Sequence, residues 1–172
     1  MPPIFKSSVK FGAIGAGVIA FIFLAYYVLG SNPLIEMDMI DVFILPIFLF
    51  FGIKEYRERY NNQLLEFWQG MTVGFFVYTT MATVSAVFIW IFIDAIDVSL
   101  TENFVSDRLA SLHEIKNKII EEMGQDSFAE TVREVGNTSS IDVAMDGFLK
   151  KLVIGFLLTS VISVIMKRKS EK

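Results

Sequence analysis

Long stretches without a charged side chain alternate along the chain with short charged segments. Residues 11–30 carry no charge, and residues 70–93 carry none before Asp94. A hydrocarbon core of about 30 Å is crossed by a helix of about 20 apolar residues. The pattern therefore predicts membrane-spanning helices over residues 11–30 and 70–94.

Two further uncharged stretches, residues 42–53 and 152–166, are shorter than a standard span. Charged side chains at their ends can reach the headgroup region, which lengthens the part of a helix that the bilayer accepts. We therefore expect spanning helices over residues 37–56, kinked at Pro46, and over residues 149–167. The predicted fold class is all-α, a polytopic membrane protein with four transmembrane helices in a single membrane domain.

The segment between the third and fourth spans, residues 97–146, is polar and too long for a simple connection. Ser99 and Glu102 fit a capping box, and Gly124 is expected to end the helix that they begin. A shorter second helix is expected from Asp126 onward. The segment is thus predicted to be an extracytoplasmic helical hairpin whose apolar faces pack on each other, on the bundle or on another chain.

Charged residues divide unequally between the two sides of the membrane that four spans define. The side with both termini and the link between the second and third spans holds nine basic and four acidic residues, a charge of +5. The other side carries −9, and the two together give the net charge of −4. Because basic segments stay in the cytoplasm, both termini are expected there.

The composition narrows the chemistry that the chain can perform. It is 53% hydrophobic with a mean hydropathy of +0.54, and it has no cysteine and one histidine. The usual ligands of zinc, haem and iron–sulfur centres are therefore missing, as are thiolate nucleophiles. No ionisable residue falls in the middle of a span, which argues against a pump. We predict no enzymatic activity, no metal, no cofactor and no nucleic-acid partner.

Two pairs of carboxylates are expected at the outer ends of the second and third spans. The two members of each pair are three residues apart, so they lie on the same face of a helix. The four residues are Asp38, Asp41, Asp94 and Asp97. Lys150 and Lys151 are expected at the same depth, where they favour salt bridges with this outer rim. A cation site or an acid–base site is the alternative interpretation.

A basic and aromatic collar is expected at the cytoplasmic end of the second span. It consists of Lys54, Arg57 and Arg59 with Tyr56 and Tyr60 between and beside them. Such a collar anchors a span at the headgroups, and it also attracts anionic lipid. Anchoring is the interpretation that we favour.

Small residues recur every four positions in the first span, at Gly12, Ala16 and Ala20. This spacing permits close approach of another helix. The face therefore predicts helix packing, with the third span, a second copy of the chain or a different protein as its partner.

Four short motifs follow one another along the chain. They are Ser31-Asn32-Pro33-Leu34, Gly52-Ile53-Lys54-Glu55-Tyr56-Arg57, Leu65-Glu66-Phe67-Trp68-Gln69-Gly70 and Glu121-Glu122-Met123-Gly124. Their order and spacing resemble domain-of-unknown-function family 4199, a group of four-helix proteins of the bacterial inner membrane, over nearly the whole chain. The resemblance implies that location and, as a candidate partner, a membrane glycosyltransferase of the polyprenyl-phosphate sugar type. It assigns no catalytic residue.

The missing catalytic chemistry favours a non-catalytic integral inner-membrane protein. We expect an accessory or scaffold subunit for a membrane partner, such as an enzyme of envelope glycan or lipid assembly. The alternative is a small transporter or lipid-handling protein that uses the hydroxyl-rich faces of the third and fourth spans with Tyr26, Tyr27 and Tyr78. The expected partners are membrane lipid and either a membrane protein or a second copy of the chain.

Overall fold

The computed structural model describes residues 3–168, except for the side chains of Asp38, Met39 and Asp41. Every regular element in this range is a helix, which confirms the all-α prediction. In chain order the elements are α1 (Pro3–Val28), α2 (Pro33–Glu55), the π-helix η1 (Tyr56–Tyr60), α3 (Phe67–Ala95), α4 (Ser99–Glu114), α5 (Lys116–Met123), α6 (Gln125–Gly136) and α7 (Ser140–Met166).

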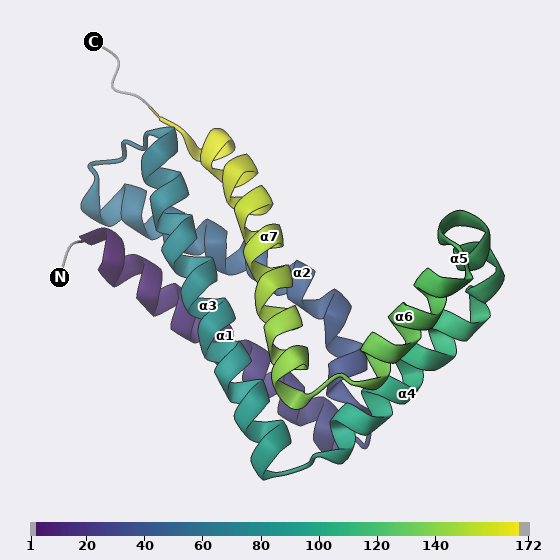
Figure 1. The fold of residues 1–172 in the computed structure, drawn as a ribbon. Coiled ribbons are helices and arrows are strands. Elements are labelled where there is room, and N and C mark those ends of the chain that lie inside the picture. The colour runs from purple at the N-terminus through teal and green to yellow at the C-terminus, as the bar shows by residue number, and fades with distance from the viewer. Residues whose placement is uncertain (1–2, 169–172) are drawn as a thin grey trace.

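The four long helices form a bundle, and the three short helices form an arm (Figure 1). Within the bundle, α3 makes its most extensive contacts with α7 and α1, and α2 packs on all three of these helices. Both ends of the described chain lie at the same end of the bundle, which we call the terminal end. The arm, α4 to α6, leaves from the opposite end, the arm end, and projects away from the bundle.

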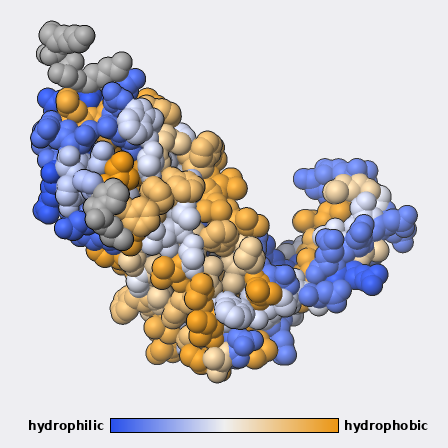
Figure 2. Space-filling model, turned by 60° about the vertical axis from the view of Figure 1, so that its left-hand side comes forward, coloured by the Kyte–Doolittle hydropathy of each residue, from blue (hydrophilic) through white to orange (hydrophobic). Residues whose placement is uncertain are grey.

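Three helices, α1, α3 and α7, are long and apolar enough to cross a membrane. They fit a multi-pass membrane protein, and Figure 2 shows hydrophobic residues over the middle of the bundle and hydrophilic ones at the terminal end and on the arm. The helix α2 is not among them, because its uncharged stretch covers only residues 42–53; Glu36, Asp38 and Asp41 precede that stretch, and Lys54 and Glu55 follow it.

Two of the helices begin earlier than their apolar stretches suggested. The first starts at Pro3, where Ser7 is buried and its Oγ donates to the Gly52 carbonyl oxygen of α2 at 3.0 Å. The last starts at Ser140, because Ser139 and Asp142 form a capping box in which the Ser139 N–H donates to Asp142 Oδ2 at 2.9 Å. Both helices thus extend beyond their apolar parts, where Ser7 bonds to another helix and Ser139 bonds within its own capping box.

Glycines let α3 and α7 approach closely. Gly70 lies against Ser163, and Gly74 lies against Thr159. A Cβ atom built on Gly74 would be 2.7 Å from Thr159 Oγ1, far inside ordinary contact distance. On α7, Gly155 lies in the same manner against a tyrosine ring of α3. The spacing of these two helices is therefore set by positions that have no side chain.

The small-residue face of α1 contacts α3 of the same chain at Gly12. A Cβ atom there would be 2.7 Å from Thr80 Cβ. Ala16 is 1% exposed, whereas Ala20 is only partly buried. Nearer the arm end, Phe23 of α1 replaces the small residues and meets the ring of Phe92 edge-on at 5.1 Å between centroids. The contact between α1 and α3 is thus made by small residues near Gly12 and by aromatic rings nearer the arm end.

A pair of backbone hydrogen bonds closes the terminal end. The N–H of Leu65 donates to the carbonyl oxygen of Arg168, and the N–H of Arg168 donates to the carbonyl oxygen of Leu65, both at 2.9 Å. Leu65 lies in the link between η1 and α3, and Arg168 follows α7. The link is thereby tied to the segment that follows the last helix.

The first arm helix is capped differently from the capping box that the sequence predicted. Ser99 is already inside α4, and the N-cap residue Val98 makes no side-chain capping bond. Asp97 Oδ1 accepts hydrogen bonds from the Ser99 N–H at 3.0 Å and from the Ser99 hydroxyl at 2.6 Å. The prediction of a capping box from Ser99 and Glu102 was therefore wrong, because Ser99 is the first residue of α4 and its hydroxyl donates to Asp97.

The long helix expected in the arm is divided in two at Ile115. Its first part ends at Glu114 and its second part begins at Lys116. The predicted end at Gly124 is confirmed, since α5 stops at Met123 and Gly124 has φ +88° and ψ 164°. The last helix of the arm, α6, packs back on α4 and α5.

Candidate functional site

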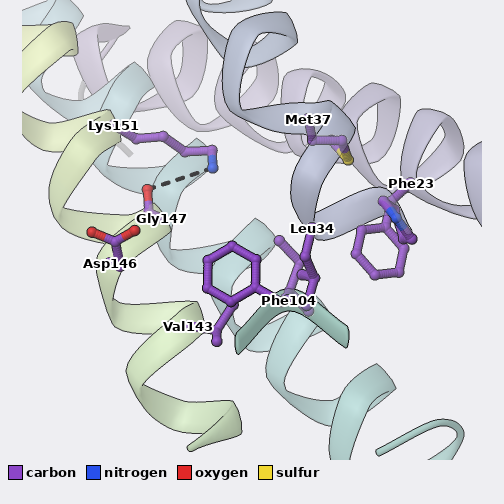
Figure 3. Close-up of a pocket in the computed structure, with 10 residues that line it drawn as sticks. Phe23, Leu34, Met37, Phe104, Val143, Asp146, Gly147 and Lys151 are labelled. Atoms are coloured by element: carbon purple, nitrogen blue, oxygen red, sulfur yellow. Dashed lines mark hydrogen bonds between the residues drawn. The ribbon is translucent and has the colours of Figure 1, made fainter. Parts of the chain in front are cut away.

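A buried lysine lies at the arm end of the bundle (Figure 3). Lys151 of α7 is 3% exposed, and its Nζ donates to the Gly147 carbonyl oxygen at 3.5 Å. Beside it is a cavity of about 40 Å³ lined by all four bundle helices and by α4. The lining includes Phe23, Leu34, Met37, Phe104, Val143 and Asp146. An ammonium group is thereby held at the point where the bundle meets the arm.

The size of this cavity limits what Lys151 can do. Sites for small molecules usually measure about 300–1,000 Å³, whereas about 40 Å³ holds one or two waters. A buried ammonium also needs polar partners, because leaving it without them in an apolar setting is costly. Lys151 is therefore a structural residue of the junction rather than the centre of a substrate site.

The structure describes the side chains of four of the six residues predicted to share one outer rim. Asp94 is exposed, and Lys150 Nζ binds Asp146 Oδ2 at 2.7 Å on its own helix. Asp97 binds Ser99, and Lys151 turns inward to Gly147. Asp38 and Asp41 lie in α2, but their side chains are outside the described part of the structure. Among the described side chains, no group of three histidines, aspartates or glutamates is placed to hold a metal.

Hydrogen bonds hold Asp97 in its charged form. The Ser99 hydroxyl is the main cause that lowers the pKa of Asp97, and the Ser99 N–H and the Tyr27 hydroxyl lower it further against a smaller opposing effect of desolvation. The carboxylate therefore links the end of α1 to the start of α4 at neutral pH. Because the pKa is lowered in the folded protein, this stabilisation is lost as the pH falls through the carboxyl range.

The sequence did not single out Asn32 as a second connection between bundle and arm. Its side-chain oxygen accepts from the Leu34 N–H at 3.0 Å and caps α2, while its Nδ2 donates to the Leu100 carbonyl oxygen of α4 at 2.9 Å. An asparagine before Pro33 is an ordinary helix-start signal, which gave a clue to the first contact. The second contact joins residues far apart in sequence and had no local signal.

A polar network at the terminal end centres on Glu55 of α2, which the sequence prediction overlooked. Its side chain is 9% exposed and accepts from three donors. Lys10 Nζ lies 2.9 Å from Glu55 Oε1, Arg59 Nη1 lies 3.3 Å from the same oxygen, and Ser7 Oγ lies 3.3 Å from Oε2. One nearly buried carboxylate thus fixes cations from both α1 and η1.

The structure divides the predicted basic collar into two parts. Arg57 turns toward α7, where its Nη1 donates to the Met166 carbonyl oxygen at 3.5 Å, and its Nη2 binds Glu58 at 3.2 Å. Lys54 and Arg59 instead border a shallow groove of about 210 Å³ between α1 and the end of α2. We call this the basic groove, and its lining includes Lys10, Phe11, Phe51, Lys54, Glu55 and Arg59.

Three hydroxyl-bearing residues of α3 and α7 lie against glycines of the facing helix. Thr159 and Ser163 are fully buried, and neither hydroxyl has a hydrogen-bond partner among the described residues. Tyr78 is 5% exposed and packs on Gly155. These contacts make the seam between α3 and α7 tight at Thr159, Ser163 and Tyr78.

Comparison with known proteins identifies a family but no better-known relative. A family model described as "Protein of unknown function (DUF4199)" matches residues 10–168. The resemblance that the four sequence motifs indicated is thereby confirmed over nearly the whole chain. No curated protein and no solved structure matches the chain.

Proposed function

The chain belongs to the DUF4199 family, whose function is unknown, and from this premise we propose that it is a non-catalytic integral protein of the bacterial inner membrane. Four helices, α1, α2, α3 and α7, span the bilayer. Both termini are cytoplasmic, and the arm is the extracytoplasmic hairpin. The +5 charge of the terminal side and the −9 charge of the arm side support this orientation.

Packing supports α2 as the fourth span. It lies against the three apolar helices, and it buries Leu45 and Leu49 almost completely. Its opposite face exposes Phe43 at 69% and Ile47 at 52%. A helix that is apolar both toward its neighbours and away from them suits a bilayer, whereas water would favour a polar outer face. The charges of α2 lie near its two ends, where headgroups and water can solvate them.

The observation that best supports an accessory role is that the arm projects from the bundle. Its residues 99–136 include eight acidic and four basic side chains. Two large apolar side chains are nonetheless exposed around α5, Ile115 at 51% and Met123 at 65%. An acidic helical arm with exposed apolar side chains suits contact with another protein beyond the membrane surface. We therefore propose that the chain supports a membrane enzyme of envelope glycan or lipid assembly, such as a glycosyltransferase.

Co-purification of the full chain tests this role. We expect a tagged protein, cross-linked in its native membrane and purified in mild detergent, to recover one envelope-assembly enzyme identified by mass spectrometry. Replacing Ile115→Asp together with Met123→Asp should reduce that recovery at least severalfold, because charge replaces the apolar contact. Asn117→Asp adds charge to the same arm without removing an apolar side chain, so it should retain the partner.

Recovery of only the tagged chain at every concentration would contradict the accessory role. Equal recovery with the double variant and with Asn117→Asp would show that the arm is not the contact. An unchanged elution volume in detergent confirms that each variant is folded.

A further inference from the structure

The basic groove at the terminal end combines cations with an aromatic floor. Lys10, Lys54 and Arg59 border it, and the rings of Phe11 and Phe51 also line it, stacked with centroids 6.5 Å apart and 15° between their planes. Lys10 Nζ lies 4.9 Å from the centroid of the Phe11 ring. The charged groups and the apolar floor therefore belong to one continuous surface between α1 and α2.

Existing ion pairs hold two of these cations in place and leave a third available. Glu55, itself 9% exposed, forms ion pairs with Lys10 and Arg59. Each of these two cations still has further N–H groups that can donate. Lys54 makes no ion pair with a described residue, and its Nζ lies 6.0 Å from the ring centroid of Phe50. The other carboxylate of the groove, Glu58, is paired with an arginine outside it. The groove thus offers uncompensated positive charge at Lys54.

We propose that the basic groove binds the phosphate of an anionic phospholipid. The phosphate lies among the three cations, and the adjoining acyl chain runs along Phe11 and Phe51 toward the middle of the bundle. A lipid fits better than a free phosphate because Phe51 is 46% exposed on the bundle surface and needs an apolar neighbour. Charge complementarity favours a lipid with net negative charge over a zwitterionic one.

This proposal depends on the proposed membrane topology only in that α1 and α2 reach the membrane surface at the terminal end. It does not depend on the arm or on a protein partner. Lipid binding by the purified chain and recovery of a partner enzyme are separate measurements, so either proposal can fail without the other.

Native mass spectrometry of the full chain in detergent tests the groove. We expect the protein to retain phosphatidylglycerol in preference to phosphatidylcholine. Lys54→Gln should weaken phosphatidylglycerol retention about fivefold, the factor expected when one lysine near an anionic headgroup is lost. Lys167→Gln removes the same charge from the terminal end but lies after α7, outside the groove, and should leave retention unchanged.

Three results would overturn the proposal. Equal retention of the two lipids removes the charge preference, and equal weakening by Lys54→Gln and Lys167→Gln reduces the effect to general electrostatics. Soluble glycerol phosphate that displaces phosphatidylglycerol at the same concentration would show that the groove recognises phosphate without its lipid chain.

Discussion

The glycines between α3 and α7 control the distance between two helices that are far apart in sequence. Their positions repeat every four residues on α3, at Gly70 and Gly74, and the facing hydroxyl residues repeat in the same way on α7. Small residues at such spacing can be found in a sequence, as they were in α1. Their partners cannot, because the pairing of Gly74 with Thr159 depends on the relative height of two antiparallel helices.

Gly74→Ala is expected to destabilise the bundle by about 1–3 kcal/mol, the usual cost of overfilling a packed interface. The added methyl meets Thr159 directly. Thermal unfolding of the detergent-solubilised protein should show a lowered midpoint. Gly17→Ala is the matched control, because Gly17 is exposed on α1 and has nothing within 4 Å of an added Cβ.

Adding Thr159→Ala to Gly74→Ala should restore part of the lost stability, since it removes the atoms that the new methyl meets. Equal midpoints for Gly74→Ala and Gly17→Ala would mean that the seam does not set the helix spacing.

At the scale of single elements, the chain shows which helix boundaries local signals can define. Gly124 ends α5 because its φ and ψ suit glycine alone, and a glycine after an amphipathic run is a recognisable stop. The break at Ile115 has neither glycine nor proline to announce it. The start of α4 differs from its local signal, because Ser99 is inside the helix and donates to Asp97 instead of capping it.

Gly124→Ala is expected to loosen the arm without affecting the bundle. Forcing an L-residue into φ +88° and ψ 164° costs about 1–3 kcal/mol. Hydrogen exchange followed by mass spectrometry should show faster exchange in α5 and α6 and unchanged exchange in α3 and α7.

Gly136→Ala is the control for this change. Gly136 also lies in the arm and has open space around it, but its backbone is not in the left-handed region. Faster exchange throughout the bundle of Gly124→Ala would indicate that arm and bundle unfold as one unit.

At the scale of the whole molecule, the sequence predicts an all-helical chain that enters the membrane more than once. Uncharged runs are sufficient for that, because the bilayer demands them. The proposed fourth span, α2, is harder to recognise, because charged residues near both of its ends shorten its uncharged run. The outer rim stays a prediction, because the side chains of Asp38 and Asp41 lie outside the described part of the structure; of the other members, Asp97 binds Ser99 and Lys150 binds Asp146 one turn earlier on α7.

Single cysteines can test the four-span topology, because the natural chain has no cysteine. An impermeant maleimide should label Leu29→Cys and Asn117→Cys in intact cells with a permeabilised outer membrane. Leu64→Cys, in the link before α3, should react only after the inner membrane is opened. If α2 does not span, Leu29→Cys and Leu64→Cys will react from the same side.

The bond between Leu65 and Arg168, together with the glycine seam, imposes an order on biosynthesis. The ribosome makes Gly70 and Gly74 well before the helix that covers them, and in the proposed topology the whole arm crosses the membrane in between. In that topology the first three long helices enter the bilayer before α7 is made, so the face of α3 that α7 covers is still exposed and Leu65 has not yet met Arg168. Arrival of α7 covers that face and ties the link in a single late step. The bundle is therefore complete only after α7, the last helix, has packed on α3.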